Sequence, residues 1–263
     1  MLTNTVIVFL RDFLPIVILL SYLAVLTRQP IIAAGVWQQW FLPGFGLATI
    51  TIFFIQSIAA AFAGAGLEVF NAAMLIVAYG GLALGAAICL YSATRSALAN
   101  TLLLLGSAAL VASKLIELFI FFGVYLQHAE ALQTVLMGIV VGLGICFSFA
   151  IIFHFLINEL YQSSFSAIVL LLWTAFIAGQ LAQVTGLLAQ VDLVSLGAPV
   201  VNLNHWVADS SEYGHVLNTL IGYEASPSLH FLLVYLLAMF SPLAFYYLRI
   251  TSGNRQGRSN RHA

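Results

Sequence analysis

The sequence predicts an all-α integral membrane protein with seven transmembrane helices. Apolar residues make up 62% of the chain and charged residues only 6%, and the mean hydropathy is +1.07. Soluble domains carry roughly 25% charged residues, so this composition excludes an ordinary soluble fold. The formal net charge of −1 gives no sign of a nucleic-acid partner. The lipid bilayer is the partner that the composition predicts.

Seven apolar stretches are long enough to cross a bilayer, which takes about 20 residues of helix. They are expected at 5–26, 44–64, 69–91, 98–125, 132–157, 165–189 and 228–249. The first stretch lacks the basic start and small-residue cleavage site of a removable signal, so we interpret it as a retained span. The second and third are separated only by residues 64–68, where we expect a tight turn.

Basic residues predict the orientation. With seven spans, the loops and tail that hold arginine all fall on one side, and positive residues mark the cytoplasmic side. These residues are Arg28, Arg95, Arg249, Arg255, Arg258 and Arg261. We therefore expect a cell (inner) membrane protein with its N-terminus outside and its C-terminus in the cytoplasm. Residues 1–250 are expected to form one membrane domain, and the polar residues 251–263 a disordered cytoplasmic tail.

Two charged pairs interrupt the apolar spans. Arg11 and Asp12 lie in the first span, and Lys114 and Glu117 lie in the fourth. Ionised groups at that depth cost several kcal/mol each unless they are paired or hydrated. Spacing i, i+3 places Lys114 and Glu117 on one helix face.

The predicted orientation places both pairs in the outer half of the membrane, where they could meet across a helix interface. Glu68 is expected above them, at the outer end of the second and third spans. Two interpretations remain open. The pairs form a hydrophilic vestibule for a cation, or they form a neutralised cluster that holds the helices in register.

The long loop at 190–227 is expected outside the membrane. It holds side chains of the types that ligate metals, among them His205, Asp209, Glu212 and His215. These residues predict either an external metal-capture site or a solvated interfacial loop, because no ordered ligand spacing distinguishes the two.

Other reactive residues indicate no catalytic site. Cys89 and Cys146 are expected to be buried free thiols. A haem would need paired histidines, and His128 and His154 are roughly 39 Å apart along a helix, which leaves His230 as the remaining partner. No nucleophile elbow, phosphate loop or zinc motif is present, so neither an enzyme nor a tightly bound cofactor is expected. A haem-bearing electron-transfer subunit remains one alternative function.

Four segments together resemble the oxidase-dependent iron permease family. The family carries an R-E-x-x-E motif in helices one and four, and this chain has Arg11-Asp12-Phe-Leu-Pro15 and Ser113-Lys114-Leu-Ile-Glu117 there. Residues 64–71, GAGLEVFN, are similar to the family's G-x-x-x-E-x-x-E entry to helix three. Residues 222–228, GYEASPS, are similar to its G-Y-x-x-x-P-S entry to the last helix.

The resemblance implies two inverted three-helix repeats followed by a seventh helix. It implies iron as the transported ion, with Asp12, Glu117 and Glu68 as its ligands. Arg11 and Lys114 would be charge-balancing or gating groups. An extracytoplasmic redox or metal-binding protein is the implied partner, within a homo- or hetero-oligomer.

The chain departs from the family pattern at the metal motifs. Pro15 replaces the second glutamate of helix one, and Lys114 replaces the first glutamate of helix four. The two motifs therefore carry a formal net charge of zero, where the family pattern carries −2. Iron needs anionic oxygen ligands to offset its dehydration. An alternative is therefore a non-transporting membrane subunit that keeps the permease scaffold and docks a redox or metal-binding partner.

Overall fold

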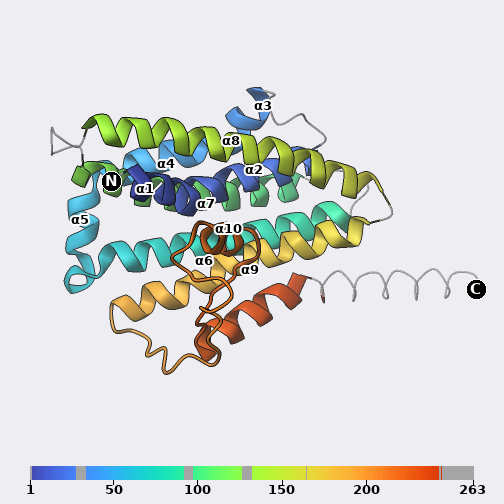
Figure 1. Ribbon diagram of the computed structural model, residues 1–263. Helices are drawn as coiled ribbons and strands as arrows, with labels where there is room; N and C mark the ends of the chain where they lie inside the picture. Colours follow the sequence, from blue (N-terminus) through green and yellow to red (C-terminus); the bar gives the residue numbers. More distant parts are fainter. Residues whose placement is uncertain are drawn as a thin grey trace, which may run out of the picture.

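The computed structural model describes residues 2–27, 34–91, 97–125, 132–163, 165–242 and 244. Within these ranges the chain is almost entirely helical, and its one β-bridge joins Pro199 to Ser228. The predicted tail, the arginine-bearing loops and the loop that holds His128 lie outside the described residues. Figure 1 shows the long helices packed side by side as one bundle.

Five helices in the described part are long and apolar enough to cross a membrane. They occupy Thr3–Thr27, Gly66–Cys89, Ala97–Gly123, Gln133–Gln162 and Ser166–Gln190. Each overlaps a predicted span to within a few residues at most of its ends. The prediction of a multi-helix membrane protein is thus confirmed, because these lengths and compositions suit a bilayer core.

The first span consists of α1 (Leu2–Val8), a π-helix (Phe9–Phe13) and α2 (Leu14–Thr27). It is the most enclosed of the five, with 83% of its apolar window buried. Its neighbours are α7 (Ala97–Tyr125), α8 (Leu132–Gln162) and α10 (Glu212–Ile221). A helix that is apolar all round belongs in the middle of a bundle.

The second predicted span is broken. Residues Trp37–Phe53 and Ile55–Gly64 form two helical segments that meet at Phe54 with a bend of 67°. The first comprises a π-helix (Trp37–Phe41) and α4 (Leu42–Phe53); the second comprises α5 (Ile55–Ala60) and a 3₁₀ turn (Ala61–Gly64). Counted as one span, this pair gives six. The predicted seventh corresponds to a shorter apolar helix, Leu229–Pro242.

The turn expected at residues 64–68 lies a few residues earlier. Phe62, Ala63 and Gly64 have positive φ angles, and α6 (Gly66–Tyr91) begins two residues after Gly64. Glu68 therefore belongs to the first turn of the α6 helix and not to the connection before it. A carboxylate at that position interacts favourably with the positive end of the helix dipole.

The α6 helix packs against α7 and against α9 (Ser166–Gln190). By contrast, only 28% of the apolar window of α8 is buried. The outward face of α8 exposes large apolar side chains, such as Val140 and Ile152, each about 70% exposed. In a bilayer such a face contacts lipid, because lipid tails are as apolar as leucine.

The segment 190–227, predicted as a plain external loop, folds back into the bundle. It contains α10, which packs against α9, α2 and the π-helix of the first span (Figure 1). Ser211 caps the start of α10 by accepting a hydrogen bond from Gly214 N, and Gly222 ends the helix in the left-handed conformation. These are ordinary start and stop residues for a helix.

Candidate functional site

The π-helix of the first span presents the first charged pair. The Arg11 guanidinium donates two hydrogen bonds to the Asp12 carboxylate, Nε to Oδ1 at 2.8 Å and Nη2 to Oδ2 at 2.9 Å. Asp12 is fully buried, whereas the Arg11 side chain is 53% exposed. A bidentate pair of this kind is among the stronger hydrogen-bonded contacts in proteins. The π-helix thus holds an ion pair whose carboxylate is buried and whose guanidinium is partly exposed at a cavity.

The second pair comes from α7. Lys114 Nζ lies 3.6 Å from Glu117 Oε2, and its closer contact is a 2.9 Å hydrogen bond to Gln183 Oε1 on α9. The Lys114 side chain is 3% exposed and that of Glu117 is 25% exposed. The lysine therefore divides its donors between its own helix and α9.

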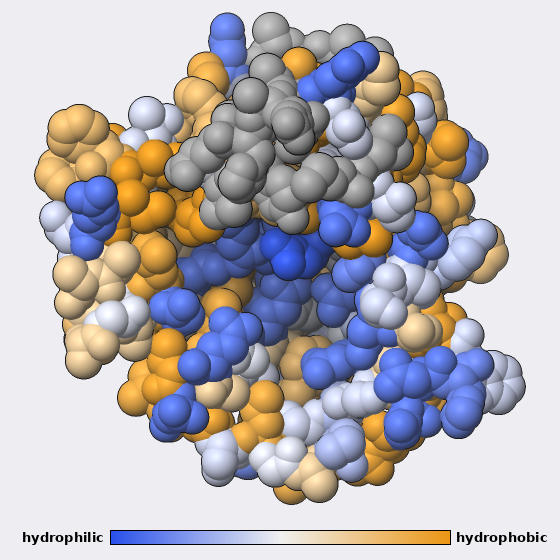
Figure 2. Space-filling view, turned by 60° about the vertical axis from the view of Figure 1, so that its left-hand side comes forward, coloured by the Kyte–Doolittle hydropathy of each residue, from blue (hydrophilic) through white to orange (hydrophobic). Residues whose placement is uncertain are grey.

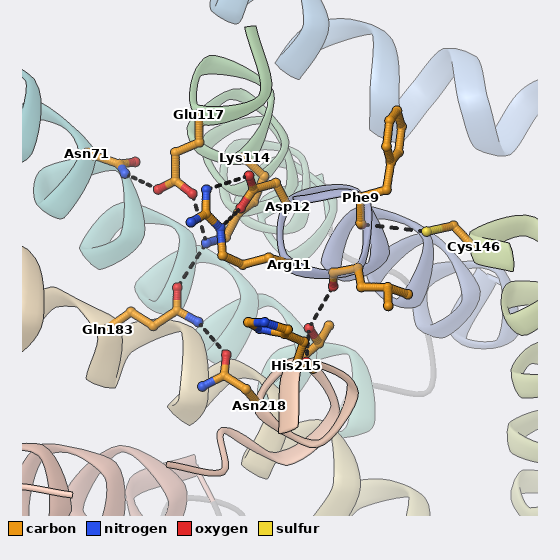
Figure 3. Close-up of polar contacts among 12 residues, drawn as sticks. Phe9, Arg11, Asp12, Asn71, Lys114, Glu117, Cys146, Gln183, His215 and Asn218 are labelled. Carbon is orange, nitrogen blue, oxygen red and sulfur yellow. Dashed lines mark hydrogen bonds and ion pairs between the residues drawn. The ribbon is translucent and has the colours of Figure 1, made fainter. Parts of the chain in front are cut away.

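The amide and hydroxyl groups nearby complete the hydrogen bonds of Glu117. Asn71 on α6 donates from Nδ2 to Glu117 Oε1 at 2.5 Å, and the Ser113 hydroxyl donates to Asn71 Oδ1. Figure 3 shows the labelled side chains of Asn71, Glu117, Lys114, Gln183, Arg11 and Asp12 converging from α6, α7, α9 and the first span. The two charged pairs, which the sequence indicated could meet, lie together here, since Arg11, Lys114 and Glu117 line the same cavity with Asp12 beside them (Figure 3).

These groups surround one polar cavity of about 540 Å³. Its lining comes from the first span, α6, α7, α9, α10 and the segment leading into the last helix. The charged and amide residues of the lining are Arg11, Glu68, Asn71, Lys114, Glu117, Gln183, Gln190, Asn218 and Glu224. Figure 2 shows hydrophilic side chains gathered in a hollow among the apolar helices. We call this space the polar cavity.

The charges at the polar cavity are not balanced. Three carboxyl groups of the lining, those of Glu68, Glu117 and Glu224, face two cationic groups, Arg11 and Lys114, while Asp12 is buried behind the wall. The formal net charge of the lining is −1 when all five groups are ionised. Burial raises the pKa of Glu224, and the neighbouring Asp209 carboxylate raises it further. A positively charged occupant would offset both effects, since it would favour the ionised form of Glu224 and balance the net negative lining.

The α10 helix seals one side of the site through close contacts. Thr219 Oγ1 donates to the carbonyl of Leu10 in the first span at 3.3 Å. A Cβ on Gly179 of α9 would lie 2.5 Å from Gly222 Cα, so the two backbones touch. Gly179 is eleven residues from the end of α9 at Gln190, which corresponds to about 16 Å of helix. The C-terminus of α10 thus reaches well into the bundle.

The predicted external metal-capture residues lie in and beside the first turns of α10. His205 and Asp209 are exposed, Glu212 begins α10, and Asp209 accepts a hydrogen bond from Ala225 N at 2.7 Å. His215 instead lies on the side of α10 near Arg11 (Figure 3). Burial and the Arg11 charge lower the pKa of His215, whereas the nearby carboxylates of Asp209 and Glu212 raise it in part. These side chains lie near one another, but they are not arranged as a metal-binding group among the residues described.

No group of three or more histidine, cysteine, aspartate and glutamate side chains is arranged to hold a metal ion among the residues described. The predicted ligands Asp12, Glu68 and Glu117 share the polar cavity or lie behind its wall, but they do not form such a group in this conformation. Of the histidines considered for haem, His154 is buried within α8 and His230 is exposed, and neither lines the polar cavity.

Two amide residues of the site, Gln183 and Asn218, were missed by sequence reasoning. Gln183 binds Lys114, and its Nε2 donates to Asn218 Oδ1 at 3.4 Å; Asn218 in turn donates to the carbonyl of Tyr223 at 2.8 Å. A signal was present, because Gln180, Gln183 and Gln190 recur on one face of an otherwise apolar helix.

The fold and the site together define a multi-span membrane protein with a charged polar cavity among its helices. Comparison with models of known protein families, with curated proteins and with solved structures finds no match. The function is therefore inferred from the residues of the site.

Proposed function

We propose that this chain is a membrane transport protein that binds a cation in the polar cavity. The observation that carries the proposal is the position of this cavity, which lies among spanning helices and has a net negative lining. Ionisable side chains inside a membrane protein are costly, and they commonly mark the path of an ion or a polar substrate.

Iron is the cation that the sequence resemblance implies. The ligands available are oxygens, namely the carboxylates of Asp12, Glu68 and Glu117, with Glu224 and the amide of Gln183 at the same cavity. Carboxylate and carbonyl oxygens suit hard divalent cations such as iron(II) and manganese(II). These groups must move closer together to bind the cation, so transport requires a change of conformation.

Lys114 is the charge-balancing or gating group of this proposal. Its ammonium lies between Glu117 and Gln183, 3.6 Å from the carboxylate and 2.9 Å from the amide oxygen, and its flexible stem allows it to leave Glu117 while keeping the contact with Gln183. Arg11 plays the same part for Asp12. An entering cation must compete with Lys114 and Arg11 for the carboxylates of Glu117 and Asp12. These two side chains therefore lower the affinity of the site for the transported cation.

The transport proposal includes the predicted membrane arrangement. It has seven spans as two inverted three-helix repeats and a final helix, with the N-terminus outside the inner membrane. In that arrangement the two charged pairs lie at equivalent positions of the repeats, on helices of opposite direction. Their meeting at one cavity supports this arrangement.

Uptake into sealed vesicles tests the proposal. Purified protein is reconstituted, and iron(II), manganese(II) and potassium uptake are each measured. Glu117→Gln and Asp12→Asn should each reduce uptake of the transported cation at least tenfold. Glu159→Gln is the matched control, because Glu159 is an exposed glutamate of α8 away from the polar cavity. Equal uptake by all four proteins would refute the proposal.

The second candidate is a non-transporting subunit that docks an extracytoplasmic redox or metal-binding protein. The observation that favours it is the pairing of Arg11 with Asp12 and of Lys114 with Glu117, which leaves the innermost charges neutralised. In that case the pairs hold helices in register. Absence of uptake by the unmodified protein, together with a fixed partner after purification in mild detergent, would select this function.

A further inference from the structure

Gln180 lies one helical turn beyond the polar cavity, away from its mouth. Both atoms of its amide, Nε2 and Oε1, are buried without a hydrogen-bond partner, and the residue is 2% exposed. Each buried polar atom without a partner costs about 1–3 kcal/mol. A leucine would fill the same space without the cost of burying an unpartnered amide. The glutamine at this position therefore indicates a ligand for the amide.

Gln180 is aligned with the cavity wall. It precedes Gln183 by three residues on α9, so the two side chains share a helix face about 4.5 Å apart along the axis. Gln183 is the residue that binds Lys114 at the cavity. Gln180 is thus the next polar group inward from the Lys114 site.

The neighbouring element favours a cation at this level. Gly179, adjacent to Gln180, touches Gly222 at the C-terminal end of α10. The C-terminus of a helix carries a partial negative charge from its carbonyl groups. Helix C-termini that end inside membrane proteins therefore provide cation sites.

The path is closed on the far side of Gln180. Phe176, one turn further along α9, contacts Tyr22 with 5.8 Å between ring centroids, and Tyr22 contacts Trp173 at 5.1 Å. Beyond these rings lies a second, mostly apolar cavity of about 210 Å³, lined by the first span, α6, α8 and α9. Gln180 thus separates the polar cavity from an aromatic closure.

We propose that the Gln180 amide and the C-terminal end of α10 form an inner cation position, which receives the cargo from the polar cavity before the aromatic closure opens. This inference rests on the proposed transport function. It adds a second binding position to the site at Glu117, with the Gln180 amide oxygen as its ligand.

Cysteine labelling tests the inner position without requiring transport. Cys89→Ala and Cys146→Ser remove the native thiols, and Gln180→Cys introduces a reporter. A cationic and an anionic methanethiosulfonate are applied to the protein in detergent, with rates normalised to a free thiol. Ala178→Cys is the matched negative control, being fully buried two residues away on another face of α9. Gln190→Cys, exposed at the cavity mouth, is the positive control.

Gln180→Cys should react with the cationic reagent at least ten times faster than with the anionic reagent, and at least ten times faster than Ala178→Cys. A rate no higher than that of Ala178→Cys, or a preference for the anionic reagent, would overturn the inference. The labelling result stands whether or not the unmodified protein transports a cation, so the two proposals fail separately.

A second variant covers the case in which Gln180→Cys does not fold. Gln180→Leu keeps a similar volume and removes the buried amide, so it should be at least as stable as the unmodified protein. Its cation uptake should fall at least tenfold, whereas Gln162→Leu, at an exposed glutamine of α8 outside the lining of the polar cavity, should change uptake less than twofold. Normal uptake by Gln180→Leu would show that the amide has only a packing role.

Discussion

The interaction between Lys114 and Glu117 can be measured with a double-mutant cycle. Lys114→Met and Glu117→Gln are made singly and together, and the free energy of unfolding is compared among the four proteins. At the 3.6 Å separation of the charges, Coulomb's law gives about 4.6 kcal/mol at an effective dielectric of 20 and about 1.2 kcal/mol in bulk water. Glu117 is one quarter exposed to the polar cavity, so the coupling should be about 2 kcal/mol.

Unfolding in mixed micelles on titration with sodium dodecyl sulfate, followed by circular dichroism, provides the free energies. Lys114→Met should be the more damaging single change, because it leaves the two carboxylates of Asp12 and Glu117 with Arg11 as their one remaining counter-charge among the cavity residues. The double variant should recover part of that loss. A coupling below about 0.5 kcal/mol would refute the reasoning and would mean that the Gln183 contact alone holds the lysine.

Three further predictions concern α9, α10 and the loop beside them. Gly179→Ala should lower the free energy of unfolding by about 1–3 kcal/mol because its Cβ would meet Gly222, whereas Gly186→Ala, with open space around it, should not lower it. Tyr235→Phe removes the 2.6 Å hydrogen bond to the Ile221 carbonyl and should cost about 1 kcal/mol; an unchanged unfolding midpoint would contradict this. Because the folded-state pKa of Glu224 is raised, its neutral form is favoured and stability should fall as pH rises through that pKa. Glu224→Gln should flatten the fall, as unfolding measured from pH 4 to 8 would show.

The long helices were predictable because their signal is strong. Each of the five spanning helices is an apolar run with little competing signal, and its length alone distinguishes it from a soluble helix. The meeting of the two charged pairs was predictable for a related reason. Charges at similar depth in two spans are strongly favoured to face one another rather than lipid.

The departures from the prediction depend on contacts that a single sequence does not display. No proline lies at the bend around Phe54, so that break has no local sequence signal. Each π-helix, by contrast, ends two residues before a proline, Pro15 or Pro43, whose missing N–H disturbs the regular hydrogen bonding of the preceding turn. The α10 helix was not predicted, because residues 190–227 were interpreted as one external loop. Its cap residues Ser211 and Gly222 were visible, but the close contact that draws it into the bundle is a tertiary effect.

In the π-helix of the first span, backbone carbonyl groups help to fix the position of Arg11 and Asp12 among the helices. The Phe9 carbonyl accepts the Leu14 N–H and also the Cys146 thiol from α8, at 3.6 Å, and the Leu10 carbonyl accepts the Thr219 hydroxyl from α10. Both acceptors belong to the backbone, so they are retained whatever side chain stands at positions 9 and 10. Natural variation at these two positions can therefore alter the packing around Arg11 and Asp12 while leaving in place the two acceptors that tie this turn to α8 and α10.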